Sequence, residues 1–411
     1  MIKSYLKSKS INPLFLIGPN GSGKTYSLKK YQDITEGKSI YISEDGYLDV
    51  KMLRSEAIPN LETHEYIIYP KSKYYGETKE REEAKTHTID SKLLDLISFC
   101  KKEIEFYKSI KHKSKGQEKA FNIFNIIYKS YMNPIKFIFF DEPENYLDDL
   151  GLRKISILFE HLKKAEIKLI VSTHSYSLCN LLNVSINNII FINRSFDIKK
   201  SSYTNSMIKL TLNSVKRIYK ESTIDFENFI KDKKLDVDGG IRNKMHFYED
   251  PKLLDLYLND ILKSEQFYRA LFYKKIVLVE GPSENRIIRK LNIEELHDNY
   301  FYVTYGKCYM IFFVNLFSKI GKDILIISDS DKKYKKNADK YNTAYGITMY
   351  LEKYHSDIIK LFDVDLENHF NIDKAYFENK GLSTNEVKVY AADDFFSSKR
   401  NINKFTKFLD K

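Results

Sequence analysis

One stretch near the start of the chain is the strongest indication of its fold. It comprises Gly18, Pro19, Asn20, Gly21, Ser22, Gly23, Lys24 and Thr25. An apolar run at residues 13–17 precedes it and helix-forming residues follow, which predicts a strand, a loop and a helix. In that setting the glycine amides can turn toward phosphate, Lys24 can reach the β and γ phosphates, and the Thr25 hydroxyl can ligate Mg2+. The stretch therefore predicts a phosphate-binding loop that holds ATP with Mg2+.

Length and composition set the frame for the rest. At 411 residues the chain exceeds the size of one ordinary core, so we expect two or three domains. Hydrophobic residues make up 43% and charged residues 30%, which is typical of a globular protein. The net charge of +11 favours a polyanionic partner, although a lysine-rich composition can also reflect an AT-rich genome.

The compartment is indicated by cysteine usage and hydropathy. Cys100, Cys179 and Cys308 are odd in number and far apart, which fits a reducing compartment without a disulfide framework. The apolar run near the N-terminus is too short for a signal or a membrane span, and no later run reaches membrane length. We expect a cytoplasmic protein with no membrane partner.

Two further apolar runs end in polar groups suited to ATP hydrolysis. Residues 136–140 lead into Asp141 and Glu142, and residues 168–172 lead toward His174. Taken alone, an Asp-Glu pair at a strand end would be read as a helix cap. After a phosphate-binding loop, Asp141 is expected to hold Mg2+ through water, Glu142 to polarise the attacking water, and His174 to sense the γ phosphate.

The patterns divide the chain into three parts. An α/β domain over residues 1–211 is followed by a mainly helical, charged connector over 212–272. Residues 273–411 form a second α/β domain, because buried-strand runs recur at 275–279 and 323–327. The fold class is α/β with parallel sheets and chemistry at their carboxyl ends.

A second set of acidic residues follows the strands of the last domain. Glu280 and Glu284 come after one strand, and Asp329 and Asp331 come after the next, so four carboxylates can meet at one sheet edge. Glu367 is a candidate further ligand. Such hard oxygen ligands favour Mg2+ or Mn2+, and two ions could support phosphodiester cleavage. The structural alternative is a set of solvated caps at strand ends.

A predicted helix start between the phosphate-binding loop and Asp141 adds a further candidate for nucleotide binding. Ser114, Gly116 and Gln117 lie at this start, where a hydroxyl and exposed amides can bind an anion. With the other motifs, this segment resembles the signature of the ABC-type ATPases. The resemblance implies a homodimer in which the signature of one copy closes over ATP held by the other, with residues from Asn145 to Asp148 as the D-loop between the sites.

The chain departs from that family in two respects. Its three glutamines are Gln32, Gln117 and Gln266, and none lies where a Q-loop glutamine is expected. Only about ninety residues separate Thr25 from Ser114, which leaves no room for the coiled-coil arms of chromosome-structuring relatives. Sensing through a Q-loop glutamine is therefore not expected.

The acidic centre carries a second resemblance. The order Glu280, Gly281 and Glu284, then Asp329 and Asp331, resembles the Toprim domain. An ABC-type ATPase followed by a Toprim domain resembles the overcoming-lysogenisation-defect (OLD) family. The resemblance implies a metal-dependent nuclease controlled by an ATPase dimer, often in antiphage defence, alone or with a partner protein.

The same resemblance implies a C-terminal lysine near the metals, which would stabilise charge on the scissile phosphate. Lys399, before an expected final helix at residues 401–409, is the candidate, and a solvated surface lysine is the alternative. Four lysines after Asp331 could instead hold a nucleic-acid backbone, namely Lys332, Lys333, Lys335 and Lys336.

These observations leave three functional hypotheses. The first is an ATP-regulated nuclease dependent on Mg2+ or Mn2+, with DNA favoured over RNA. The second is an ATP-gated nucleic-acid-binding or scaffold protein whose Toprim domain does not cut. The third is a toxin-like ribonuclease acting on a specific RNA such as tRNA. A topoisomerase is excluded because no further domain remains for a tyrosine nucleophile and strand passage.

Overall fold

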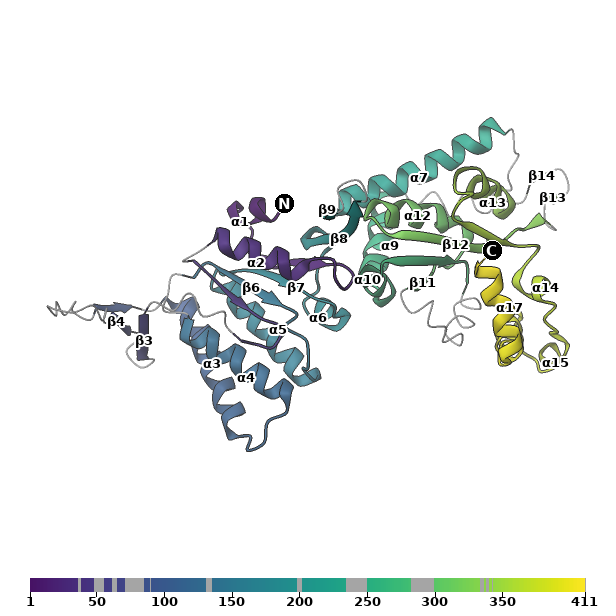
Figure 1. Ribbon diagram of the computed structural model, residues 1–411. Helices are drawn as coiled ribbons and strands as arrows, with labels where there is room; N and C mark the ends of the chain where they lie inside the picture. The colour runs from purple at the N-terminus through teal and green to yellow at the C-terminus, as the bar shows by residue number, and fades with distance from the viewer. Residues whose placement is uncertain are drawn as a thin grey trace. The chain divides into compact units, whose positions relative to one another are not determined.

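The structure divides the chain into two compact units, Met1–Lys209 and Leu210–Lys411. It is a computed structural model (Figure 1). The residues it describes are 1–35, 38–47, 55–60, 65–70, 85–88, 90–130, 135–197, 202–233, 250–281, 299–332, 336–337, 340–341 and 343–410.

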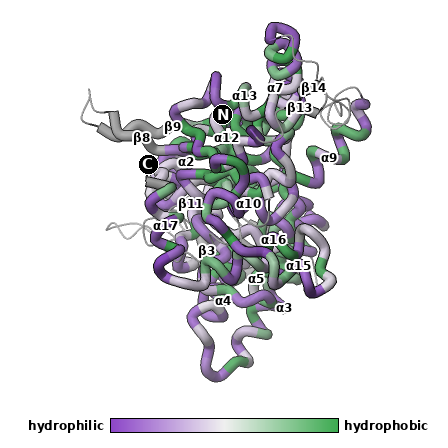
Figure 2. Tube along the Cα trace, turned by 90° about the vertical axis from the view of Figure 1, so that its right-hand side faces the viewer, coloured by the Kyte–Doolittle hydropathy of each residue, from purple (hydrophilic) through white to green (hydrophobic). Residues whose placement is uncertain are grey.

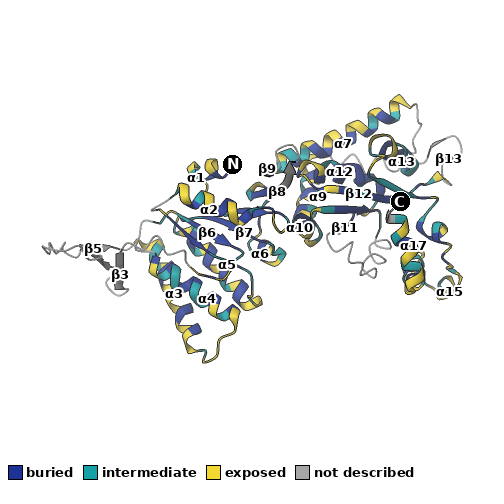
Figure 3. Ribbon diagram, viewed as in Figure 1, coloured by how far each residue is buried: buried dark blue, intermediate teal, exposed yellow. Residues whose placement is uncertain are grey.

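The first unit is built on a six-stranded sheet in the order β2-β6-β7-β1-β8-β9. All neighbours are parallel except β8 and β9. The inner strands are almost fully buried because their residues are apolar on both faces, as is usual for parallel sheets (Figure 3). The strands are β1 (Leu14–Ile17), β2 (Ser39–Ile42), β6 (Phe137–Asp141), β7 (Lys168–Ser172), β8 (Ile189–Asp197) and β9 (Ser202–Lys209).

Helices cover this sheet. Helix α2 packs on β2, β6 and β7, whereas α5 packs on β7 and also on α3 and α4, which pack tightly together. Along the helices the trace alternates between hydrophobic and hydrophilic residues, as expected for helices with one buried face (Figure 2). The helices are α1 (Ile2–Lys7), α2 (Lys24–Ile34), α3 (Ser91–Ser109), α4 (Lys115–Ser130), α5 (Asp149–Lys164) and α6 (Tyr176–Leu181).

A separate three-stranded antiparallel sheet belongs to the first unit in sequence. It has the order β3-β4-β5 and comprises β3 (Ser55–Asn60), β4 (Glu65–Pro70) and β5 (Lys85–Thr88). Along the chain it lies between β2, the edge strand of the main sheet, and the helix α3.

The second unit has a four-stranded, fully parallel sheet in the order β11-β10-β12-β15. One face of it packs on a cluster that includes Val277, Ile327 and Phe370, and the opposite face is covered by α12. The strands are β10 (Lys275–Val279), β11 (Asn299–Val303), β12 (Asp323–Asp329) and β15 (Ile359–Phe362). Two short strands pair as β13 (Lys336–Asn337) and β14 (Lys340–Tyr341).

The helices of this unit include those expected as a connector. Most of the described residues in 212–272 are helical, and α7 packs on α12 and α13 inside the second unit. The helices are α7 (Leu212–Asp232), α9 (Pro251–Lys263), α10 (Glu265–Phe272), α12 (Met310–Lys319), α13 (Thr343–Tyr354), α14 (Leu366–Phe370), α15 (Ala375–Glu378), α16 (Thr384–Phe395) and α17 (Lys399–Asp410).

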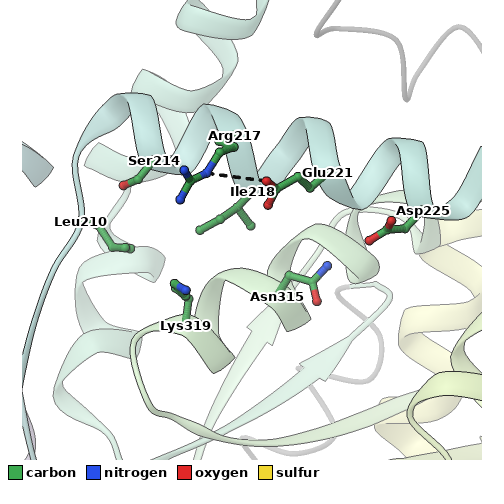
Figure 4. Close-up of a pocket in the computed structure, with 8 residues that line it drawn as sticks. All are labelled: Leu210, Ser214, Arg217, Ile218, Glu221, Asp225, Asn315 and Lys319. Atoms are coloured by element: carbon green, nitrogen blue, oxygen red, sulfur yellow. Dashed lines mark ion pairs between the residues drawn. The ribbon is translucent and has the colours of Figure 1, made fainter.

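A cavity of about 300 Å³ lies between α7 and α12 (Figure 4). Two basic and two acidic side chains line it, and Arg217 Nε lies 3.6 Å from Glu221 Oε1. Its charges therefore nearly balance, and it favours no class of charged ligand. The lining residues are Leu210, Ser214, Arg217, Ile218, Glu221, Asp225, Asn315 and Lys319.

The expected fold class is confirmed, because both units are α/β and each is built on a parallel sheet. One boundary differs: the last helix begins at Lys399 itself, two residues earlier than expected. Lys399 is thus the first residue of α17, and it is exposed.

Candidate functional site

The phosphate-binding loop joins β1 to α2. A Cβ atom on Gly18 would lie 2.1 Å from the Ile192 carbonyl oxygen, so only glycine fits there. Gly21 and Gly23 have φ angles of 71° and 92°, in the left-handed region that glycine adopts without strain. The strand, loop and helix therefore have the arrangement that the motif requires, with the loop amides at the N-terminus of α2.

Lys24 lies over this loop. Its side chain is buried, and Nζ donates to the carbonyl oxygens of Gly18 at 3.1 Å and Pro19 at 3.2 Å. Desolvation lowers the pKa of Lys24 to about 8, although the charges of Glu142 and Asp141 oppose the shift. An anionic phosphate beside Nζ would favour the charged form and raise this pKa again.

Asp141 is held at the end of β6 by two hydroxyl groups. Tyr41 OH donates to Oδ2 at 2.7 Å, and the Ser172 hydroxyl donates to Oδ1. The strand β7, which carries Ser172, lies between β6 and β1, so the predicted motifs share one sheet edge. This edge can present a carboxylate to a magnesium ion near the phosphate-binding loop.

The structure brings Glu142 and His174 into contact. Glu142 Oε1 lies 3.1 Å from His174 Nε2, and Asn145 Nδ2 donates to Glu142 Oε2 at 2.8 Å. These interactions, chiefly with His174, lower the pKa of Glu142 despite its partial burial. Its φ of 46° is unusual for a non-glycine residue and marks a backbone held in place by its surroundings. The geometry suits a carboxylate kept ionised as a general base.

Glu144 positions the loop that carries the histidine. Its Oε1 accepts from the Thr173 hydroxyl at 2.6 Å and from the His174 backbone N–H at 2.8 Å. Desolvation raises the pKa of this carboxyl group. The sequence patterns did not identify Glu144, because its partners follow the neighbouring strand β7 and lie far from it along the chain.

The predicted signature touches the D-loop of the same chain. A Cβ on Gly116 would lie 2.0 Å from the Tyr146 carbonyl oxygen, so the glycine allows a close backbone approach. The Ser114 hydroxyl accepts from the Gln117 N–H at 3.3 Å, and Gln117 Oε1 accepts from the Ser114 N–H at 3.0 Å. In a single chain, the signature side chains therefore cap their own helix.

Asp148 caps a helix of its own chain. Its Oδ1 accepts from the Gly151 N–H at 2.7 Å and caps α5. The cap fixes the end of the D-loop, and a contact of Asp148 with nucleotide stays a prediction.

Two other residues link the signature helix and the strand β2 to Glu142. Lys119, which is buried, donates to the Glu142 carbonyl oxygen at 2.7 Å, and desolvation lowers its pKa to about 8. Glu44, just after β2, accepts from Asn145 Nδ2 at 2.8 Å. Asn145 thus links Glu44 to the Glu142 carboxylate, in a chain that lacks a Q-loop glutamine at the expected place.

The acidic centre lies at the carboxyl edge of the second sheet. Glu280 follows β10 directly and Asp329 ends β12, which pairs with β10 in parallel. Asp331 has a φ of 53°, a left-handed conformation that is uncommon for aspartate. Desolvation raises the pKa of Glu280, while Lys307 opposes the shift and Asp331 adds to it. Three of the four predicted carboxylates therefore lie at one edge.

An ammonium group lies among these carboxylates. Lys307 Nζ donates to Asp331 Oδ2, to the Asp329 carbonyl oxygen at 2.5 Å and to the Thr348 hydroxyl at 3.0 Å. It also lies 3.8 Å from Glu280 Oε2. The Lys307 side chain is only 3% exposed. The sequence reasoning missed Lys307, because a lone lysine after a glycine carries no recognised signal.

The donor set fits a divalent metal ion in its chemistry. The carboxylates are hard oxygen donors, and the ammonium of Lys307 shows that they stabilise a cation at this edge. Across the described residues, no three His, Cys, Asp or Glu side chains converge closely enough to hold an ion as they stand. Glu284 lies outside the described residues.

The other residues predicted for this centre have varied outcomes. Glu367 is buried in α14, after the strand β15 that pairs with β12, and its role as a ligand stays a prediction. Lys388 in α16 acts electrostatically on Glu280, whereas the candidate Lys399 begins the next helix. Lys332 is exposed. The lysines at 333 and 335 lie outside the described residues, and the one at 336 begins β13.

Comparison with known proteins identifies the domain that carries the acidic centre. Residues 271–331 match the family model of the overcoming lysogenization defect protein-like TOPRIM domain. The expected Toprim domain is thereby confirmed, and with it the OLD-like character of this part of the chain. No curated protein matches the chain.

Solved structures similar to the chain include ATP-binding cassette proteins. One is the ATP-binding cassette MJ0796 in a dimeric post-hydrolysis state bound to ADP and Pi, with 18% identity, 41% of this chain and 78% of that chain covered, and a TM-score of 0.25. Another is a transporter assigned to the metal-chelate ABC type in an inward-facing conformation, with 13% identity, 49% and 88% covered, and a TM-score of 0.25. TM-scores this low assign no residue of this chain.

Among the helices that the structure describes, none is both long enough and apolar enough to cross a membrane.

Proposed function

We propose that the chain is an ATP-regulated nuclease that needs divalent metal ions and cleaves phosphodiester bonds of nucleic acid. One observation carries the proposal: Glu280, Asp329 and Asp331 lie at the carboxyl edge of a Toprim-type sheet. The other unit of the same chain holds a phosphate-binding loop with an ordered acid, base and histidine. ATP would act as the switch and nucleic acid as the substrate.

The ATPase half has a role for each residue. Lys24 would bind the β and γ phosphates, and Thr25 with Asp141 would hold Mg2+. Glu142 would accept a proton from the attacking water, with His174 at its carboxylate. The signature at Ser114 would serve the nucleotide of a second copy, which makes a homodimer or a higher homo-oligomer the working form.

The nuclease half depends on its carboxylates and lysines. Glu280, Asp329 and Asp331, with Glu284, would hold Mg2+ or Mn2+. Bound there, the metal would lower the pKa of water and offset charge on the attacking and leaving oxygens. Lys388, which acts electrostatically on Glu280, is a better-placed candidate than Lys399 for contact with the scissile phosphate.

Charge and the OLD-like domain support the biological setting that we propose. A net charge of +11 suits a nucleic-acid partner, with DNA favoured over RNA. We place the protein in the cytoplasm, in antiphage defence, alone or with a separate partner protein. A toxin-like action on a specific RNA such as tRNA is the alternative substrate of the same chemistry.

One experiment tests the function. The protein is incubated with plasmid, single-stranded DNA and tRNA, with Mg2+ or Mn2+, with and without ATP. Cleavage that needs metal and disappears in Asp329→Ala supports the nuclease, whereas wild-type protein inert on every substrate refutes it. Glu142→Gln, which should bind ATP without hydrolysing it, separates the two roles of the nucleotide. Nuclease activity indifferent to ATP in both proteins would end the regulatory part of the proposal.

A non-cutting scaffold is the second candidate, and one observation favours it. The Lys307 ammonium pairs with Asp331 and so supplies a counter-charge to the acidic centre that a metal ion would otherwise supply. The same incubation decides, because a scaffold retains nucleic acid in an ATP-dependent way and leaves it intact with every metal.

A further inference from the structure

Lys307 is placed in the acidic centre by the sheet itself. It follows Gly306, just beyond the carboxyl end of β11, and β11 pairs in parallel with β10. The Gly306 N–H donates to the Glu280 carbonyl oxygen at 3.2 Å, which ties the turn to the strand that carries Glu280. Gly306 has a φ of 132°, which side-chain-bearing residues rarely adopt. The lysine therefore enters the centre from a third strand end.

Burial of this ammonium needs compensation. A lysine with a 3% exposed side chain loses nearly all of its hydration, which is costly unless the charge is paired and hydrogen-bonded. Here all compensation comes from groups at the site, namely Asp331, the Asp329 carbonyl, the Thr348 hydroxyl and, more distantly, Glu280. The carboxylates in turn gain a counter-charge that limits their mutual repulsion.

We propose that Lys307 is a built-in counter-ion of the acidic centre and that a divalent metal ion must displace its ammonium from Asp331 in order to bind. Two of its bonds, to the Asp329 carbonyl and to Thr348, do not involve side-chain carboxylates. The ammonium can therefore give up Asp331 while it stays anchored. Lys307 keeps the centre assembled without metal and lowers its affinity for metal.

The inference rests on the metal site of the proposed function, and its test measures ion binding in place of cleavage. Mn2+ is titrated into the full chain without nucleotide, and free Mn2+ is followed by electron paramagnetic resonance. Asp329→Asn identifies the ions that belong to the acidic centre. Lys307→Met, which keeps the length of the side chain and removes its charge, should bind these ions at least about tenfold more tightly than wild type.

Thermal unfolding gives a second readout. Without metal, Lys307→Met should melt below wild type, because the carboxylates lose their counter-charge. Mn2+ should then raise its melting temperature more than that of wild type, since tighter binding to the folded state gives greater stabilisation. If Lys307→Met does not fold, Lys307→Gln removes the charge while it keeps a donor for the Asp329 carbonyl, and the same tightening is expected.

Lys322→Met is the matched control. Lys322 is another buried lysine of this unit, and it donates to the carbonyl oxygens of Leu271 at 2.6 Å and Tyr273 at 2.7 Å. It precedes β12, at the edge of the sheet opposite to the acidic centre. Its loss should lower the melting temperature and leave Mn2+ affinity as in wild type.

Three outcomes are informative. Equal Mn2+ affinity in wild type and Lys307→Met overturns the counter-ion role and leaves the metal site intact. Weaker binding in the variant also overturns it and makes Lys307 a support for the ligands. If wild type, Lys307→Met and Lys322→Met all bind no Mn2+ beyond what Asp329→Asn binds, the metal site itself is overturned, and with it the metal-dependent nuclease.

Discussion

ATP binding should take up a proton at Lys24. In the free protein, burial lowers the pKa of Lys24 from 10.5 to about 8, so its charged form is lost as pH rises through that value. Bound phosphate would raise the pKa again. At pH 9 only about a tenth of the free protein carries the charge, so binding should take up about 0.9 proton, against about 0.25 at pH 7.5. The affinity for ATP should weaken about eightfold between these two values.

The assay is isothermal titration calorimetry with ATP, at both pH values, in two buffers of different ionisation enthalpy. The difference in heat between buffers gives the number of protons taken up. Lys119→Met is the control, because the pKa of Lys119 is also lowered to about 8 and its charge lies near the same carboxylates. Uptake that persists in this variant assigns the proton to Lys24, and uptake that vanishes assigns it to Lys119. Equal affinity at the two pH values, with no uptake at pH 9, would refute the reasoning.

The stability of the free protein should follow the same pKa. Between about pH 8 and pH 10.5 the unfolded chain binds more protons at Lys24 than the folded chain does, so this residue makes stability rise with pH. Below pH 8 the full cost of the buried charge is present, and ATP should relieve it. Melting temperatures with and without ATP should therefore differ more at pH 7.5 than at pH 9.

Three further changes test the geometry of the nucleotide site. Gly116→Ala puts a Cβ 2.0 Å from the Tyr146 carbonyl oxygen, so ATP hydrolysis should fall at least about tenfold while ATP binding by the single chain persists; hydrolysis at the wild-type rate would contradict the contact. Tyr41→Phe removes a hydrogen bond to Asp141 and should cost about 1 kcal/mol of unfolding free energy and raise the Mg2+ concentration that half-saturates hydrolysis; an unchanged Mg2+ dependence would count against it. Glu144→Ala releases the loop that carries His174 and should lower kcat without weakening ATP binding, which filter binding and steady-state rates can separate.

Local patterns predicted the strands and motifs well, for a physical reason. The phosphate-binding loop, Asp141 and the strand at 168–172 are each decided by a few adjacent residues, since buried strands are continuous apolar runs. Polar groups directly after such runs must lie at the carboxyl edge of the sheet. The acidic centre was predicted in the same way, because Glu280 and Asp329 follow neighbouring parallel strands.

The contacts that organise these sites could not be read from adjacent residues. Tyr41 and Asp141 are a hundred positions apart and meet only because β2 pairs with β6. Lys307 reaches Asp331 through the order of strands in the second sheet, which spacing along the chain does not determine. Lys388, whose charge acts on Glu280, belongs to α16, the helix before the one that begins at Lys399, and spacing along the chain did not single it out.

The helix α4 has a consequence for how two ATP molecules would communicate. Its first turn carries the signature, which in a head-to-tail pair would contact the nucleotide of the partner copy. One turn further on, Lys119 donates to the backbone carbonyl of Glu142, the residue proposed as general base for the chain's own nucleotide. In such a pair, α4 would contact the nucleotide of the partner copy at its first turn and Glu142 of its own chain through Lys119. A shift of this helix at one site would therefore change the position of groups at the other. With one such helix in each copy, ATP hydrolysis at the two sites would be cooperative.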